Sequence, residues 1–261
     1  MTLPNELQPF VDDPAHAVLL LDFDGSIAPI VDDPASAAAL PAMTGVLRAL
    51  TPMLARLAVV SGRTVDFLAA ALPIDGITLV GLYGLERRSG GSTIVDARAE
   101  PWIAPIAAAA ADAEAALPGL LVERKGNLCV TIHFRTAPER GGDARAVADD
   151  LARRYGIEAP QRGRMAVELR PPVPVDKGTV IEELTRDATV AAFAGDDAGD
   201  LPAFAALVQL EVAGKLAHAV RIGVASAEAP PEILAADLVV DGPPELALLL
   251  AELAGAIRTR A

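Results

Sequence analysis

Four apolar runs in this chain each end in a short polar cluster, and this arrangement constrains the fold more than any other feature. The runs are residues 17–22, 57–60, 77–80 and 189–194, and the polar residues after them include Asp24-Gly25, SGR, GLYG and GDD. Strands that are buried on both faces of a parallel sheet have such unbroken apolar sequences. Segments with helical spacing lie between these runs, at 65–72 and 180–184, and after the last of them, at 201–208 and 246–253. The alternation predicts an α/β fold with a doubly wound parallel sheet.

The middle of the chain follows a different pattern, which indicates an inserted domain. The expected elements, in chain order, are a helix at 100–117, a hairpin at 121–134, a helix at 143–155 and extended segments at 157–161 and 165–169. Helix, hairpin, helix, hairpin is an α+β pattern. Three prolines between 171 and 174 then mark a stiff return linker. We therefore expect residues 99–172 to form an α+β cap domain inserted into a core made of 1–98 and 173–261.

The charge and composition of the chain exclude some classes of partner. The formal net charge is −13, so the chain repels nucleic acid and anionic membrane surfaces, and we expect neither as a partner. Cys129 is the single cysteine, which fits a reducing cytoplasm. The first residues show no signal-peptide pattern, and the apolar runs are too short to span a bilayer. We expect a cytoplasmic monomer.

Acids and an SGR segment follow the first two strands. Asp22 and Asp24 lie two positions apart, so both carboxylates can project in one direction beyond the strand, and Gly25 permits a sharp turn. Alone, this pattern could equally be a loop whose acids cap helix donors. Ser61 could bind a phosphoryl oxygen or only cap a helix. Arg63 could reach a ligand or pair with an acid, and we take it as a substrate-binding candidate.

A lysine and three acids occur later in the chain. Lys177 opens a predicted helix, where it could neutralise a phosphate or simply lie at the surface. Asp196, Asp197 and Asp200 follow a strand closely, and such carboxylates repel one another unless a cation or a helix N-terminus compensates. This cluster favours a metal site. Ligands of open α/β sheets bind beyond the carboxyl ends of the strands, so all four clusters could meet in one crevice.

Together and in this order, the four clusters resemble the signatures of the haloacid dehalogenase-like phosphatase superfamily, whose core is Rossmann-like. The resemblance implies that Asp22 is a nucleophile that forms an aspartyl-phosphate, and that Asp24 is the general acid and base. It implies that Ser61 and Lys177 hold the transferring phosphoryl group. The implied Mg²⁺ ligands are Asp22, the backbone carbonyl of Asp24, and Asp196. Asp197 and Asp200 are each either a further ligand or a residue that contacts a ligand.

Several segments are similar to the trehalose-6-phosphate phosphatase family within that superfamily. They are DFDGSIAPI near the start, GLYGLER at 81–87, VERKGNLCVTIHFR at 122–135 and MAVELRP at 165–171. In that family a Glu-x-Lys on the first cap hairpin and a Glu on the last cap strand contact the disaccharide. The resemblance therefore implies Glu123, Lys125 and Glu168 as substrate-binding residues. Tyr83 departs from the family, because a histidine is common at its position.

The resemblance implies hydrolysis of trehalose 6-phosphate to trehalose and phosphate. Three alternatives stay open. The substrate could be another sugar phosphate, such as sucrose phosphate, glucosylglycerol phosphate or mannosylglycerate phosphate. The enzyme could be a phosphomutase that returns the phosphoryl group to a sugar, or the chain could be a non-catalytic domain that has kept the fold. We also expect an inserted domain on two linkers to hinge over the crevice.

Overall fold

The chain divides into two compact units, which we call the core unit and the insert unit. The core unit consists of Met1–Thr93 and Val175–Ala261, and the insert unit of Ile94–Pro174. The computed structural model describes residues 2–31, 33–89, 91–157, 159–163, 165–226 and 229–260. Within these ranges, we find no helix with both the length and the apolar composition that a bilayer crossing requires.

The core unit is built on an eight-stranded sheet with the strand order β12-β11-β10-β1-β2-β3-β4-β5. The strands are β1 (Ala17–Leu21), β2 (Arg56–Val60), β3 (Thr78–Gly81), β4 (Glu86–Ser89), β5 (Ser92–Val95), β10 (Val190–Gly195), β11 (His218–Ala225) and β12 (Leu238–Asp241). Neighbours from β12 to β3 are parallel, and β4 is antiparallel to β3. The predicted parallel sheet is confirmed. The strand order reverses direction between β1 and β10, so a ligand crevice is expected at their carboxyl ends.

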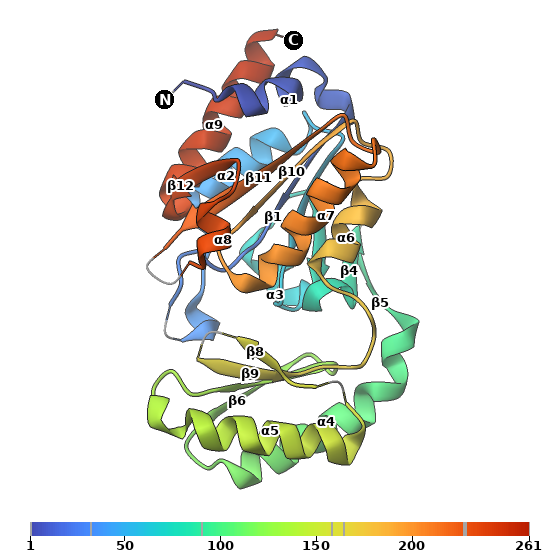
Figure 1. Ribbon diagram of the computed structural model, residues 1–261, viewed down its shortest axis with the longest axis vertical. Helices are drawn as coiled ribbons and strands as arrows, with labels where there is room; N and C mark the ends of the chain where they lie inside the picture. Colours follow the sequence, from blue (N-terminus) through green and yellow to red (C-terminus); the bar gives the residue numbers. More distant parts are fainter. Residues whose placement is uncertain are drawn as a thin grey trace. The chain divides into compact units, whose positions relative to one another are not determined.

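Helices cover both faces of this sheet (Figure 1). They are α1 (Gln8–Asp12), α2 (Pro41–Leu50), α3 (Val65–Ala71), α6 (Lys177–Leu184), α7 (Leu201–Val212), α8 (Pro231–Leu234) and α9 (Gly242–Arg260). Side chains of β1 alternate between the two layers. Leu19 packs in the cluster that contains α2 and α9 residues, and Leu20 in the cluster that contains α6 and α7 residues. Each such buried leucine contributes roughly 1.5–3 kcal/mol, so both layers fix the position of β1.

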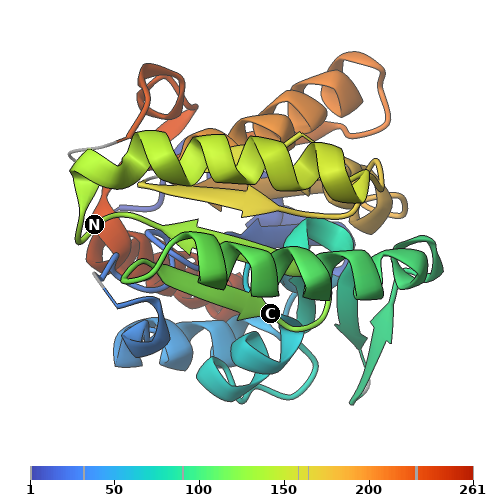
Figure 2. The same cartoon turned by 90° about the horizontal axis from the view of Figure 1, so that it is seen from below.

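The insert unit is a four-stranded antiparallel sheet, with the order β6-β7-β9-β8, that carries two helices on one face. The elements are α4 (Ile103–Ala116), β6 (Leu121–Lys125), β7 (Cys129–His133), α5 (Gly141–Tyr155), β8 (Gln161–Gly163) and β9 (Ala166–Leu169). Figure 2 shows α4 and α5 side by side over the sheet. Val130, Ile132 and Val167 face these helices in a separate apolar core. The neighbouring residues in each strand therefore form the opposite, polar face.

The expected strand at 157–161 is wrong, because β8 begins only at Gln161. Gly156 ends α5 in the left-handed conformation, with a φ of 66°, and Ile157 then packs into the apolar core of the insert unit. The backbone N–H of Ile157 donates to Ala152, which keeps the chain against the helix end. Arg164, between the two expected extended segments, lies outside the described residues.

Candidate active site

Two aspartates lie at the point where the strand order reverses. Asp22 follows β1 and Asp196 follows β10, and the two strands are paired along the whole of β1. The N–H of Asp22 donates to the carbonyl of Ala194 at 2.8 Å, so the ladder continues to the aspartate itself. Both aspartate side chains are buried. The sheet therefore sets the distance between two carboxylates that are far apart in the sequence.

Gly25 allows the chain to turn directly over Asp196. Its φ is 85°, a conformation that residues with a side chain rarely adopt, and a Cβ at this position would overlap the Asp196 carboxylate. The N–H of Gly25 donates to the carbonyl of Ala28 at 2.7 Å, which closes the turn. The glycine after Asp24 is thus required by close packing against the second acid.

Lys177 is the central cation of the site. It is the first residue of α6, whose N-terminus is capped by Asp176. Its side chain is only 3% exposed, and its Nζ lies 2.7 Å from Oδ1 of Asp22 and 2.6 Å from Oδ1 of Asp200. The alternative that Lys177 simply lies at the surface is therefore excluded.

Asp200 and Asp197 have different environments within the GDDAGD segment. Oδ2 of the buried Asp200 accepts hydrogen bonds from the N–H groups of Asp196 at 2.9 Å and Asp197 at 3.1 Å. Asp197 is half-buried, and its carboxylate accepts the N–H of Gly199 at 2.8 Å at the start of the 3₁₀ turn Ala198–Asp200. Asp200 thus faces the buried cluster, and Asp197 caps the turn.

Burial governs the protonation of this cluster. It raises the pKa of Asp22 well above its ordinary value; Lys177 opposes this effect, and the nearby acids reinforce it. Burial also raises the pKa of Asp200, again against the effect of Lys177. Burial alone would lower the pKa of the Lys177 ammonium, but Asp200 and Asp22 outweigh it and raise that pKa well above its usual range. The site is short of positive charge.

The donor set of this cluster fits a divalent cation. One carboxylate oxygen from each of Asp22, Asp196 and Asp200 lies within 4.8 Å of the others, and all three residues are buried. With all three ionised, one ammonium leaves a formal excess of two negative charges. Mg²⁺ prefers such oxygen ligands and would supply the missing charge.

Ser61 lies at the end of β2, where backbone hydrogen bonds hold the SGR loop. The N–H of Ser61 donates to Val80 at 3.0 Å, and the Ser61 carbonyl accepts the N–H of Tyr83 at 3.0 Å. The Ser61 hydroxyl accepts the N–H of Arg63 at 3.2 Å. Leu82 and Tyr83 reach this loop in left-handed conformations, with φ of 48° and 59°. Strain of this kind persists where the surroundings impose it, often at functional sites.

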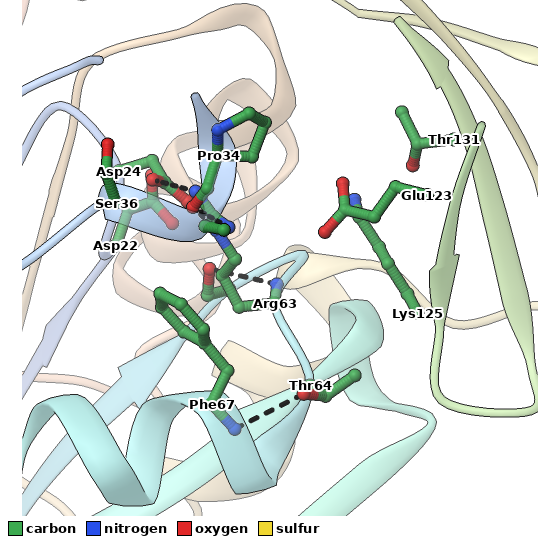
Figure 3. Close-up of polar contacts among 12 residues, drawn as sticks. Asp22, Asp24, Pro34, Ser36, Arg63, Thr64, Phe67, Glu123, Lys125 and Thr131 are labelled. Atoms are coloured by element: carbon green, nitrogen blue, oxygen red, sulfur yellow. Dashed lines mark hydrogen bonds and ion pairs between the residues drawn. The ribbon is translucent and has the colours of Figure 1, made fainter. Parts of the chain in front are cut away.

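Arg63 contacts Asp24, so the arginine pairs with an acid, the second role that the sequence left open. Figure 3 shows its guanidinium directed at the Asp24 carboxylate. Asp24 lies 39 positions earlier in the chain, and only the folded sheet brings the two together.

The three expected sugar contacts lie on the polar face of the insert unit. Glu123, Thr131 and Glu168 are neighbours in register across β6, β7 and β9. Oε2 of Glu168 accepts hydrogen bonds from Lys125 Nζ at 2.5 Å and from the Thr131 hydroxyl at 2.8 Å. Figure 3 shows Glu123, Lys125 and Thr131 on the same side of the two strands.

Two further residues of this face, Thr131 and His133, were not among the site residues expected from the sequence. Nε2 of His133 lies 2.8 Å from Oε2 of Glu123, a residue on the neighbouring strand. The alternation of polar and apolar residues in β7 was the available signal, because Thr131 and His133 share the face opposite to Val130 and Ile132.

Comparisons with known proteins identify the family to which the chain belongs. A family model described as trehalose-phosphatase matches residues 20–242. The trehalose-phosphate phosphatase of Mycobacterium avium (strain 104) is 34% identical over 206 residues, a match that covers 74% of this chain and 51% of that protein. The probable trehalose-phosphate phosphatase C of Arabidopsis thaliana is 27% identical over 213 residues, which cover 74% of this chain and 65% of that protein. The chain thus spans about half the length of the first of these relatives.

Solved structures show the same fold. The crystal structure of a trehalose-6-phosphate phosphatase related protein has a TM-score of 0.79 and 24% identity, over 94% of this chain and 100% of that chain. A haloacid dehalogenase-like hydrolase from Bacteroides thetaiotaomicron has a TM-score of 0.59 and 17% identity, over 94% and 99%. The chain has the haloacid dehalogenase-like fold and belongs to the trehalose-phosphatase family.

Proposed function

We propose that the protein hydrolyses trehalose 6-phosphate to trehalose and phosphate through an aspartyl-phosphate on Asp22. The observation that carries this proposal is the buried contact of Lys177 with Asp22 and Asp200, because it sets a nucleophilic carboxylate beside a fixed positive charge. Membership of the trehalose-phosphatase family supports the substrate. The fold supports the reaction class, since the acids follow the strands at which the sheet order reverses.

The reaction consists of two displacements at phosphorus. The carboxylate of Asp22 attacks phosphorus and forms an acyl phosphate, and the sugar oxygen leaves with a proton from Asp24. Water then attacks the phosphorus, Asp24 takes the proton of that water, and inorganic phosphate leaves Asp22. Each displacement is easier than direct hydrolysis. Ser61 donates its hydroxyl to a phosphoryl oxygen, and Lys177 neutralises the phosphoryl charge.

The buried acids are the proposed site of Mg²⁺. Asp22, Asp196 and Asp200 would hold the ion with the backbone carbonyl of Asp24, and Asp197 stays a candidate ligand. A bound ion offsets the charge of carboxylate and phosphate and stabilises the charge that is transferred.

The insert unit is the proposed cap domain, and its polar face supplies the sugar contacts. Glu123, Lys125 and Glu168 offer fixed charges on adjacent strands, and a sugar is recognised by a few well-placed donors and acceptors. Lys125 and Glu168 hold each other, which orders both groups before a sugar binds.

Phosphate release across a panel of sugar phosphates, with and without Mg²⁺, tests the proposal. We expect the highest kcat/KM with trehalose 6-phosphate, and loss of turnover in EDTA. A higher kcat/KM with sucrose phosphate, glucosylglycerol phosphate or mannosylglycerate phosphate would overturn the substrate but not the reaction class. The variant Asp22→Asn should release no phosphate above background, and unchanged release would overturn the mechanism. Phosphate labelling of the protein without release of inorganic phosphate, in the presence of a sugar bisphosphate, would instead indicate a phosphomutase.

A further inference from the structure

Arg63 holds Asp24 by both carboxylate oxygens. Its Nε donates to Oδ2 at 2.7 Å and its Nη2 donates to Oδ1 at 2.8 Å. A guanidinium that binds a carboxylate in this two-bond arrangement fixes its direction as well as its distance. The Arg63 side chain is 11% exposed and that of Asp24 is 36% exposed, so the arginine is the more buried partner.

Further contacts fix the guanidinium itself. Its Nη1 donates to the carbonyl of Pro34 at 2.7 Å, and its Cζ lies over the ring of Phe67, 4.5 Å from the ring centroid. Phe67 in turn packs edge-to-face against the buried Phe23, with ring centroids 5.5 Å apart. The group is therefore held along its edges and on one face, which is unlike an arginine that extends into a crevice to meet a substrate (Figure 3).

The Pro34 carbonyl is also held in place. It belongs to the short turn Pro34–Ser36, in which Asp33 accepts the N–H of Ala35 at 3.0 Å. The Ser36 hydroxyl donates to the carbonyl of Asp33 at 2.8 Å. Arg63 thus connects Asp24 to a second ordered segment of the core unit.

We propose that Arg63 is a positioning residue that holds the Asp24 carboxyl group for proton transfer, rather than a ligand of the substrate. This inference rests on the proposed function, in which Asp24 protonates the leaving sugar oxygen. A general acid must lie within about 2.6–3.2 Å of the atom that it protonates. The carboxyl group of a partly exposed aspartate can adopt several rotamers in water, and the two hydrogen bonds from Arg63 select one of them.

A comparison of two leaving groups tests this role. A sugar oxygen needs a proton to leave, whereas 4-nitrophenolate leaves as a stable anion. Because kcat/KM reports the steps up to departure of the first product, it isolates the protonation of the leaving group. We expect Arg63→Met to lower kcat/KM about 100-fold for the best sugar phosphate of the panel, near the lower end of what general acid catalysis contributes. The loss of kcat/KM for 4-nitrophenyl phosphate should be at least tenfold smaller. Equal losses on the two esters would overturn the proposal.

Arg63→Lys separates positioning from charge, and it also serves if Arg63→Met fails to fold. Lysine keeps the positive charge but lacks the two parallel N–H groups, so it should show the same selective loss. Recovery of wild-type kcat/KM with lysine would mean that charge alone matters, and would overturn the proposal. Arg221→Met is the matched control, because Arg221 makes the same two-bond contact with Asp237, outside the site. It should leave the ratio of the two kcat/KM values unchanged.

A double variant gives an independent result with the sugar phosphate alone. If Arg63 acts through Asp24, then Arg63→Met should cost less than about threefold in an Asp24→Asn background, because the group that it positions is gone. If the losses of kcat/KM from the two single substitutions multiply in the double variant, the proposal is overturned. The wild-type panel tests the proposed function, and only the variants measured relative to the wild type test Arg63.

Discussion

The ammonium of Lys177 lies 2.7 Å from Oδ1 of Asp22, and both side chains are buried. Replacement by methionine removes the cation from a cluster of three buried carboxylates. Because an uncompensated buried charge is costly, we expect Lys177→Met to lower the free energy of unfolding by about 3–5 kcal/mol in EDTA. Urea denaturation at neutral pH measures this change. The exposed Lys215→Met is the control, and an equal effect of both changes would contradict the prediction.

The stability of the metal-free protein should fall as the pH rises above the pKa that Asp22 and Asp200 have in the unfolded chain. The pKa values of Asp22 and Asp200 are raised in the folded state, above about 3.9 in the unfolded chain. Their contribution to the free energy of unfolding is therefore complete below the pKa of the unfolded state, and it is lost as the pH rises through the pKa of the folded state. Acids with a lowered pKa, such as Asp13 and Asp237, act in the opposite direction, but only below about pH 5.

Urea denaturation in EDTA between pH 5 and pH 8 measures this dependence. Lys177 does not contribute to the slope, because its pKa is raised from a value that is already far above this range. Asp22→Asn should flatten the curve, since an amide does not titrate. Added Mg²⁺ should also flatten it, because the ion stabilises the ionised acids. Stability that rises with pH in EDTA would show that the negative charge of the buried acids is already compensated without a metal ion.

The strands β1, β2, β3 and β10 could be predicted from the sequence because each corresponds to an apolar run. The helix α2 was missed although Met43, Val46, Leu47 and Leu50 have helical spacing and are buried. The strands β4 and β5 were missed for a physical reason. β5 is the edge strand of the sheet and β4 is its neighbour. All four residues of β5 are exposed, and β4 begins with Glu-Arg-Arg, so neither has an apolar face that a pattern could reveal.

The site residues could be named from the sequence, but their partners could not. Asp24 and Arg63 are in separate motifs, and the pairing of β1 with β2 brings them together. The GDDAGD segment offers three acids, and only the conformation of the turn Ala198–Asp200 decides which of them faces the cluster. Side-chain direction depends on backbone geometry that a motif does not encode.

Gly62 should not tolerate alanine, because a Cβ at this position would lie 2.5 Å from Oη of Tyr83. The phenol would have to move, and with it the turn whose N–H holds the Ser61 carbonyl. We expect the resulting displacement to lower kcat/KM for Gly62→Ala about tenfold, which corresponds to about 1.4 kcal/mol in the activation free energy. In a Tyr83→Ala background the same change should have almost no effect. A loss that persists without the phenol would show that the contact is not the cause.

The hydroxyl of Thr131 should order the polar face of the insert unit. Oε2 of the buried Glu168 accepts this hydroxyl, whereas Oε1 has no hydrogen-bond partner in the described part of the chain. Removal of the donor leaves a buried carboxylate with less support, so we expect Thr131→Val to lower the free energy of unfolding by about 1–3 kcal/mol.

The catalytic consequence of Thr131→Val separates substrate recognition from chemistry. If Glu168 binds the disaccharide, KM for trehalose 6-phosphate should rise several-fold, and kcat/KM for 4-nitrophenyl phosphate should change little, because that ester lacks the sugar. Thr131→Ser keeps the hydroxyl and should restore both stability and KM. Arg124→Met is a control on the same sheet, because Arg124 pairs with Glu114 on α4 and alternates with Glu123 and Lys125 along β6. An equal loss on both esters would show that Thr131 acts on the fold as a whole, and not through recognition of the sugar.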